Sequence, residues 1–235
     1  MKISDLNFPD NVKVCAFDSR EALTSNLSEQ IETTLSHAIK HRGRASLALS
    51  GGSTPIPLFN RLSKTQLAWN SVTVTLVDDR WVSPDEPDSN EKLLRTHLLQ
   101  GNASAARFIP LWQPGCSAEE ATEQCHQRLS SIDGSLDLVI LGMGNDGHTA
   151  SLFPCSAELE SALSSTADCV AVNPTTAPHA RMTLTPARLL NSESLILHIC
   201  GNDKLDTLAK ALASTPMSMP VSLFLQHPMT IYWAP

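Results

Sequence analysis

The sequence predicts an α/β fold in which a mostly parallel sheet is covered by helices on both faces. Short apolar runs, most of them rich in Val, Ile and Leu, recur along the chain and have the length of strands buried on both faces. Helical patterns alternate with these runs, which is typical of right-handed crossovers between parallel strands. No Pro/Gly/Ser-rich linker, charge block or repeat interrupts the 235 residues. We therefore expect a single domain over residues 1–235.

The expected strands follow one another at residues 12–17, 46–49, 72–77, 108–111, 136–141, 170–172, 182–184, 194–200 and 229–233. The expected helices lie between them at 19–41, 55–62, 90–99, 117–130, 157–163, 186–190 and 204–213. The helix at 117–130 opens with a capping-box pattern, because Glu120 follows Ser117 by three residues. Ligands of parallel sheets bind at the carboxyl ends of the strands, so functional motifs should directly follow the apolar runs.

The first such motif is a glycine turn, SGGSTP at 50–55. Gly51 and Gly52 let backbone amides approach an anion, and Ser53 and Thr54 follow at the positive N-terminus of the next helix. The turn lacks the Gly-Lys-Ser/Thr of a Walker A loop and does not match G-x-G-x-x-G. It favours a sugar-phosphate site, and the alternative is a tight strand-to-helix turn without a ligand.

Charged residues follow the expected strand at 72–77. Arg80 offers a planar fork of donors that suits phosphate or carboxylate, and Asp78 or Asp79 could orient it or bind a substrate hydroxyl. The adjacent acids could instead hold Mg²⁺. Taken alone, the three residues are typical of an exposed ion pair. Their place at a second strand end favours a role in a site.

The sequence LGMGNDGH at 141–148 is the most informative motif, and it ends an apolar strand. Its glycines keep the loop tight and leave backbone amides uncovered. His148 can accept a proton near neutral pH, and Asp146 could hold its ring or stabilise the imidazolium. We expect Thr149 to begin a short helical turn whose amides face an oxyanion. A lone histidine is more often structural, but this glycine frame favours His148 as a catalytic base.

Two further cations lie beside expected strand ends. Arg181 precedes the strand at 182–184, and Lys204 opens a helix after a Gly-Asn turn. Lone charges in such places are usually ordinary surface residues. Together with the glycine turn and Arg80, they predict a clamp for a phosphate group.

Composition excludes several classes of protein. The formal net charge of −7 argues against a nucleic-acid partner, because binding relies on Lys and Arg neutralising phosphates. No run of about 18 apolar residues indicates a membrane span, and the first residues lack the apolar region of a signal peptide. We therefore expect a soluble, cytoplasmic protein. The six cysteines form no C-x-x-C pair, so neither a zinc nor a redox motif is present.

Taken together, these motifs resemble those of the 6-phosphogluconolactonase family, the lactonases of the oxidative pentose phosphate pathway. The matching segments are SGGSTP at 50–55, DDRWV at 78–82 with SN at 89–90, LGMGNDGHTASLFP at 141–154, RMTLT at 181–185 and GNDK at 201–204. The resemblance covers nearly the whole chain, and GHTASLFP is its most specific part. It implies a Rossmann-like α/β fold shared with glucosamine-6-phosphate deaminases and ribose-5-phosphate isomerases.

The resemblance also implies roles for residues. His148 would be the base that activates water, Arg80 would belong to the active site, and Arg181 and Lys204 would lie near the substrate phosphate. The family needs no metal or organic cofactor, so we expect none, and the expected partner is a small phosphosugar lactone bound by a monomer. Asp79 departs from the pattern, since many relatives carry glutamate there, and Cys155 with the residues directly after it matches nothing.

Two alternatives remain. A glucosamine-6-phosphate deaminase or isomerase shares the fold, but its loop reads more like GHIAFNEP and supplies a glutamate for ring opening. Here Leu152-Phe153-Pro154 provides no acid, which favours hydrolysis over isomerisation. A non-catalytic sugar-phosphate sensor would keep the pocket without the reaction, and its binding would survive replacement of His148.

Overall fold

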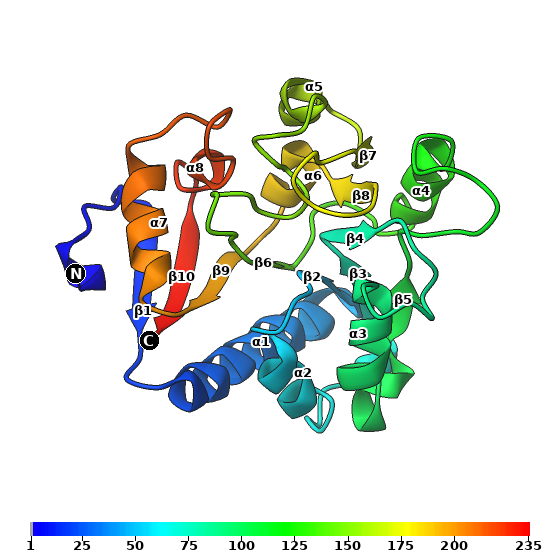
Figure 1. The fold of residues 1–235 in the computed structure, drawn as a ribbon. Coiled ribbons are helices and arrows are strands. Elements are labelled where there is room, and N and C mark those ends of the chain that lie inside the picture. Colours follow the sequence, from blue (N-terminus) through cyan, green and yellow to red (C-terminus); the bar gives the residue numbers. More distant parts are fainter. Residues whose placement is uncertain (1) are drawn as a thin grey trace.

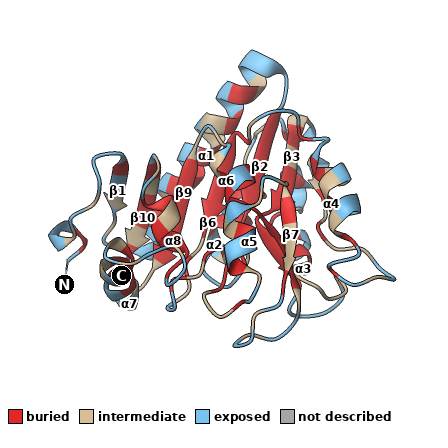
Figure 2. Cartoon of the chain, turned by 90° about the horizontal axis from the view of Figure 1, so that it is seen from above, coloured by how far each residue is buried: buried red, intermediate tan, exposed pale blue. Residues whose placement is uncertain are grey.

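The computed structural model describes residues 2–235 and contains a seven-stranded sheet (Figure 2). The strands lie in the order β1, β10, β9, β6, β2, β3, β5, and every neighbouring pair is parallel. Their bounds are β1 Val12–Ala16, β2 Ala45–Leu49, β3 Val72–Leu76, β5 Arg107–Ile109, β6 Leu138–Leu141, β9 Leu195–Cys200 and β10 Met229–Ala234. All residues of β2 and β6 are buried, as expected for strands covered on both faces. The predicted parallel sheet is confirmed.

Helices cover both faces of this sheet. Figure 1 shows α1 (Arg20–Arg42) and α2 (Ile56–Leu62) on one side and α6 (Pro186–Leu190), α7 (Asp203–Leu212) and α8 (Val221–Phe224) on the other. The remaining helices are α3 Asn90–His97, α4 Thr122–Leu129 and α5 Leu159–Ser164, with 3₁₀ turns η1 Ile3–Asp5, η2 Trp69–Ser71 and η3 Gly101–Ala105. Helix α8 and the 3₁₀ turns were not predicted. No helix within residues 2–235 is both long enough and apolar enough to cross a membrane.

The chain changes direction between β2 and β6. From β1 the chain moves to β2, β3 and β5 toward one edge of the sheet, whereas β6 leads back to β9 and β10 toward the other. Right-handed crossovers then place the connecting helices of the two halves on opposite faces. The loops after β2 and β6 therefore diverge and leave a crevice at their carboxyl ends, where open α/β sheets bind ligands.

A second, smaller sheet differs from the prediction. β4 (Asp78–Arg80), β8 (Arg181–Leu184) and β7 (Cys169–Val172) form an antiparallel sheet in that order. The strands expected at 170–172 and 182–184 exist, but they do not join the parallel sheet. The link between β7 and β8 is too short for a parallel crossover, so the two strands pair as a hairpin. β4 was not predicted as a strand, because its three residues are charged.

Helix ends follow the local sequence. Ser19 caps α1 by accepting a hydrogen bond from the amide of Ala22, and Gly43 ends the helix with a φ of 73°. The predicted capping box is confirmed: the Ser117 amide donates to Glu120 Oε2 (2.9 Å), and the Glu120 amide donates to Ser117 Oγ (3.2 Å). Helix α4 begins only at Thr122, after an intervening turn.

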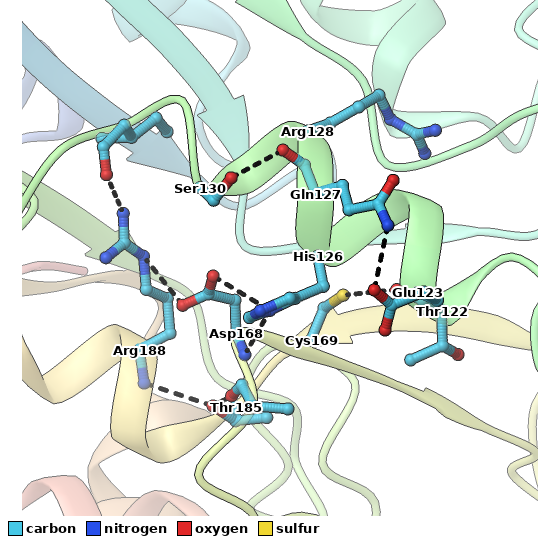
Figure 3. A network of polar contacts seen from close by, with 12 residues as sticks. Thr122, Glu123, His126, Gln127, Arg128, Ser130, Asp168, Cys169, Thr185 and Arg188 are labelled. Atoms are coloured by element: carbon cyan, nitrogen blue, oxygen red, sulfur yellow. Dashed lines mark hydrogen bonds and ion pairs between the residues drawn. The ribbon is translucent and has the colours of Figure 1, made fainter.

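A polar network joins the small sheet to two helices (Figure 3). His126 on α4 lies with Nδ1 3.1 Å from Oδ2 of Asp168, which directly precedes β7. Arg188 on α6 approaches the other oxygen of Asp168, with Nε at 3.6 Å. Thr185 caps α6 by accepting from the Arg188 amide (3.2 Å). The network therefore fixes α4 and α6 against the start of β7.

Candidate active site

A cavity of about 290 Å³ lies at the carboxyl edge of the parallel sheet, between the loops that follow β2, β6 and β9. It brings together residues that the sequence predicted from five separate segments. Those lining it are Gly51, Gly52, Ser53, Thr54, Asp78, Arg80, His148, Arg181 and Lys204. Asp146 is the predicted residue that does not line the cavity. Its carboxylate contacts Nδ1 of the His148 ring.

His148 and Asp146 form a close pair. His148 Nδ1 is 2.6 Å from Asp146 Oδ1, and the same oxygen accepts the backbone N–H of His148 at 3.1 Å. Burial raises the pKa of Asp146, but the hydrogen bond and charge of His148 outweigh it, so the pKa lies below its ordinary value. An ionised carboxylate only accepts, so it holds the proton on Nδ1. The lone pair of Nε2 is then free to accept a proton.

The loop around His148 requires glycine at one position. A Cβ on Gly144 would lie 2.2 Å from atoms of the His148 ring, so any side chain there would displace the imidazole. Phe153 covers the ring from another direction, with centroids 4.2 Å apart and planes 29° from parallel. The short helical turn expected from Thr149 is wrong: the chain makes a tight turn there, with Ala150 at a φ of 51°. Stacking and glycine contact together fix the imidazole.

The glycine turn after β2 presents free amides to the cavity. Within residues 2–235, the backbone N–H groups of residues 51–54 donate to no protein acceptor. Gly51 must be glycine, because a Cβ there would lie 2.0 Å from Oδ1 of Asn90. Gly52 adopts a φ of 92°, which a side chain would strain. The turn thus leaves several N–H donors available to an anion.

Asp79 does not line the cavity, but it holds two residues that do, Arg80 and Asn90. Its buried carboxylate accepts the amides of Arg80 (2.8 Å), Asn90 (2.7 Å) and Glu91 (3.0 Å). Burial raises its pKa to about 7; the three backbone donors oppose the shift and the charge of Asp78 adds to it. The sequence did not decide whether Asp78 or Asp79 orients Arg80, binds a substrate hydroxyl or holds Mg²⁺. The contacts of Asp79 show that it fixes the start of α3, where Asn90 contacts Gly51.

Arg80 and Arg181 lie directly opposite each other across the pair of strands β4 and β8. The Nε–H of each is buried and has no hydrogen-bond partner in the described part of the chain. Burial, followed by the charge of Arg80, lowers the pKa of Arg181, whereas Asp78 raises it. Phe153 packs against the Arg181 guanidinium, 5.5 Å from its ring centroid. Two unmet donors on neighbouring cations are suited to an anion.

Lys204 reaches the cavity from the first turn of α7. Its Nζ donates to the carbonyl oxygen of Met143 at 2.9 Å and to Oδ1 of Asn145. The ammonium therefore ties the loop after β6 to the helix that follows β9. It retains a third N–H, and it lines the same cavity as the glycine turn.

Four residues that matter to the site escaped the sequence reasoning. Asn90 buttresses the glycine turn, Phe153 stacks on His148, and Ser151 Oγ donates to Asp78. His198 lies in the middle of β9 and also lines the cavity. Each has a polar or aromatic side chain inside a matched motif or apolar run. Such a position indicates that the side chain is buried, but it does not indicate which residues it contacts.

The chain is similar to known proteins over nearly its whole length. The pattern of the glucosamine-6-phosphate isomerase/6-phosphogluconolactonase family matches residues 18–233. The 6-phosphogluconolactonase of Pseudomonas aeruginosa is 41% identical over 238 residues, which cover 100% of both chains. That of Rhizobium meliloti is 43% identical over 93% of this chain and 97% of its own.

A solved structure gives the same result. The crystal structure of a 6-phosphogluconolactonase from Shewanella baltica superposes with a TM-score of 0.94 at 44% identity, covering 97% of this chain and 100% of the other. The resemblance seen in the motifs thus extends over the whole fold. The chain belongs to the glucosamine-6-phosphate isomerase/6-phosphogluconolactonase family.

Proposed function

We propose that the protein hydrolyses 6-phospho-D-glucono-1,5-lactone to 6-phospho-D-gluconate, the lactonase step of the oxidative pentose phosphate pathway, in the cytoplasm. One observation carries the proposal: a histidine oriented by a carboxylate faces the same cavity as two cations and a turn of free amides. The names of the matched relatives support the same activity.

The substrate phosphate is bound by charge and backbone together. Arg181 and Lys204 supply the cations, and the free amides of residues 51–54 supply neutral donors. Asp78 carries a buried carboxylate that lines the cavity and accepts from Ser151. It is placed to accept a hydroxyl of the sugar. Binding at the phosphate end holds the lactone carbonyl near His148.

Hydrolysis then requires a base that activates water and a donor that stabilises the negative charge on the carbonyl oxygen. His148 Nε2 takes a proton from a water molecule, which attacks the lactone carbonyl, and Asp146 stabilises the imidazolium that forms. The unmet Nε–H of Arg80 is available to the negative charge that develops on the carbonyl oxygen. The imidazolium returns its proton to the ring oxygen as it departs. No covalent intermediate is required, because a δ-lactone is already electrophilic.

The structure disfavours a deaminase mechanism. At the place where the deaminase loop supplies its glutamate, this chain has Phe153, and that ring stacks on His148. An apolar ring at this position supplies no acid for opening a sugar ring.

The test of the proposal is an assay of freshly generated lactone, with spontaneous opening subtracted. The wild type should release acid well above background, and His148→Ala should lower the rate by about 10²- to 10⁴-fold. A loss below about tenfold, ~1.4 kcal/mol in barrier, would remove His148 from the role of base. Release of ammonium from glucosamine 6-phosphate would favour the deaminase. Tight binding of sugar phosphate without any turnover would identify a sensor.

A second assay tests the phosphate clamp. Arg181→Ala should mainly raise KM for the phosphorylated lactone, because it removes binding that ground state and transition state share. Phosphate-free gluconolactone serves as the control substrate, and its turnover should hardly change in the variant. Equal wild-type turnover of both substrates would refute the clamp.

A further inference from the structure

His198 is an unexplained polar residue inside the apolar strand β9. Its neighbours in sequence, Leu197 and Ile199, are apolar and buried, and His198 itself is only 5% exposed. The mechanism proposed above makes no use of it. The small exposed part of the residue belongs to the wall of the active-site cavity.

The position of His198 follows from the strand register. Leu197 pairs with Leu141 at the end of β6, so the next residue on that side is Gly142. Gly142 also lines the cavity and has no side chain to cover the imidazole. On the other side, His198 pairs with Tyr232 of β10. The ring thus lies in the wall between β6 and β10, at the edge where the catalytic loop begins.

The ring of His198 forms no hydrogen bond with any residue from 2 to 235, either as donor or as acceptor. Those contacts belong to His148, His126, His179 and His97, which all lie closer to solvent. Neither ring nitrogen of His198 is among the fully buried atoms that lack a partner in the described part of the chain, so the small exposed surface of the residue includes the ring nitrogens. A ring without a protein partner, in the wall of a cavity, is suited to a partner supplied by a ligand.

The protonation state of the His198 ring indicates which chemical group of a ligand it can bind. Burial lowers the pKa of His198 to about 4, so the imidazole is neutral near pH 7. A neutral imidazole has one N–H donor and one acceptor nitrogen. It cannot neutralise a phosphate, whereas Arg181 and Lys204 in the same cavity can. A hydroxyl group, which both donates and accepts, is the matching partner.

We propose that His198 is a substrate-binding residue that forms a hydrogen bond with a hydroxyl group of the bound sugar phosphate. The inference rests on the proposed function for the identity of the substrate. In this role His198 recognises the hydroxylated part of the ligand. Arg181 and Lys204 bind the phosphate, and His148 acts as the base. A ligand that carries phosphate but no hydroxylated chain gains nothing from His198.

The experiment measures binding rather than turnover. Dissociation constants for 6-phosphogluconate and for inorganic phosphate are determined by calorimetry for the wild type, His198→Leu and His198→Asn. Leucine removes the polar ring, and asparagine restores one donor and one acceptor on a similar stem. His227→Leu, a histidine outside the cavity lining, is the matched control and should bind both ligands as the wild type does.

The proposal expects His198→Leu to weaken 6-phosphogluconate binding at least tenfold and phosphate binding less than twofold, with partial recovery in His198→Asn. Unchanged binding of 6-phosphogluconate, or equal weakening of both ligands, would overturn it. If His198→Leu fails to fold, ¹⁵N imidazole resonances of the wild type decide. They should shift on addition of 6-phosphogluconate and stay unchanged with phosphate, and the absence of that shift would also overturn the proposal.

The two proposals fail separately. A wild type that opens no lactone but shows the selective loss in His198→Leu refutes the proposed function and supports the role of His198. A fully active wild type whose His198→Leu variant binds 6-phosphogluconate equally well supports the proposed function and refutes the role of His198.

Discussion

Three histidine–aspartate pairs occur in the described part of the chain, His148–Asp146, His126–Asp168 and His179–Asp88, and only the first has its histidine in the lining of the cavity. His148 and Asp146 are 2.6 Å apart, two residues from each other in a glycine loop. His126 and Asp168 are 3.1 Å apart and come from distant segments, α4 and the start of β7. Arg188 shares the carboxylate of the second pair, whereas the first carboxylate serves His148 alone.

The difference shows that a histidine–carboxylate contact does not by itself make a base. Asp168 is engaged by a cation, and its histidine joins two elements of the fold (Figure 3). Asp146 is free of such a cation, and the ring it holds ends in a cavity with Arg181 and Lys204. From these surroundings we propose a catalytic role for the first pair and a structural role for the second.

Exchanging the two carboxylates for amides would separate these roles most strongly. Asp146→Asn should lower kcat about 100- to 1,000-fold, because an amide no longer holds the Nδ1 proton or stabilises the imidazolium. Asp168→Asn should leave kcat within about twofold and lower the free energy of unfolding instead. Lactonase kinetics and denaturant unfolding of both variants provide the measurement. Similar kcat losses in the two variants would erase the distinction.

Another histidine, His198, has no carboxylate partner among the described residues. The pH dependence of the free energy of unfolding extends the comparison to it. The pKa of His198 is about 4 in the fold and its ordinary value is 6.5. As pH falls from 7 toward 4, the unfolded chain binds a proton that the folded chain does not, so the free energy of unfolding decreases. The full effect is about 3 kcal/mol. Asp79, whose pKa is raised to about 7, stabilises the fold as pH falls over the same range. The loss due to His198 is therefore measured as the difference in pH dependence between the wild type and His198→Leu, by urea unfolding at pH 7 and pH 4.5.

The variant His198→Leu should lack that part of the pH dependence, and His227→Leu should retain it. An identical decrease in stability for His198→Leu and the wild type would mean that burial does not hold the imidazole neutral.

The loop around His148 and Asp146 can be altered without replacing either residue. Gly144→Ala would bring a methyl group into the space of the His148 ring, so kcat should fall about 10- to 30-fold as the imidazole is displaced. At Gly142 an added Cβ meets only Ser50 Cβ at 3.9 Å, so Gly142→Ala should cost several-fold less. Equal kcat values for the two alanine variants would show that the ring position tolerates the shift.

The smallest expected effect concerns the structural pair. His126→Ala removes one partner of Asp168, which keeps Arg188. The free energy of unfolding should decrease by about 1 kcal/mol, with kcat and KM unchanged. Thermal unfolding and the lactone assay test this together. A kcat loss near that of His148→Ala would place both histidines in catalysis.

Local signals made most of the parallel sheet and the cavity predictable. Apolar runs set the strands, and the rule that ligands bind at their carboxyl ends brought together residues as distant as Gly51 and Lys204. The small sheet was missed as a separate unit, because β4 is three charged residues and its partners are far away in sequence. The turn at Ala150 was mistaken for a helix start, since its contacts are tertiary.

The neighbouring cations Arg80 and Arg181 have a practical consequence. Burial lowers the pKa of Arg181 and the charge of Arg80 adds to this effect, although Asp78 opposes it, so the ionised form of Arg181 carries a desolvation cost at that spot. Sulfate or phosphate in a buffer would relieve it. Such buffers would raise the melting temperature and, by occupying the clamp, slow the reaction that they were chosen to observe.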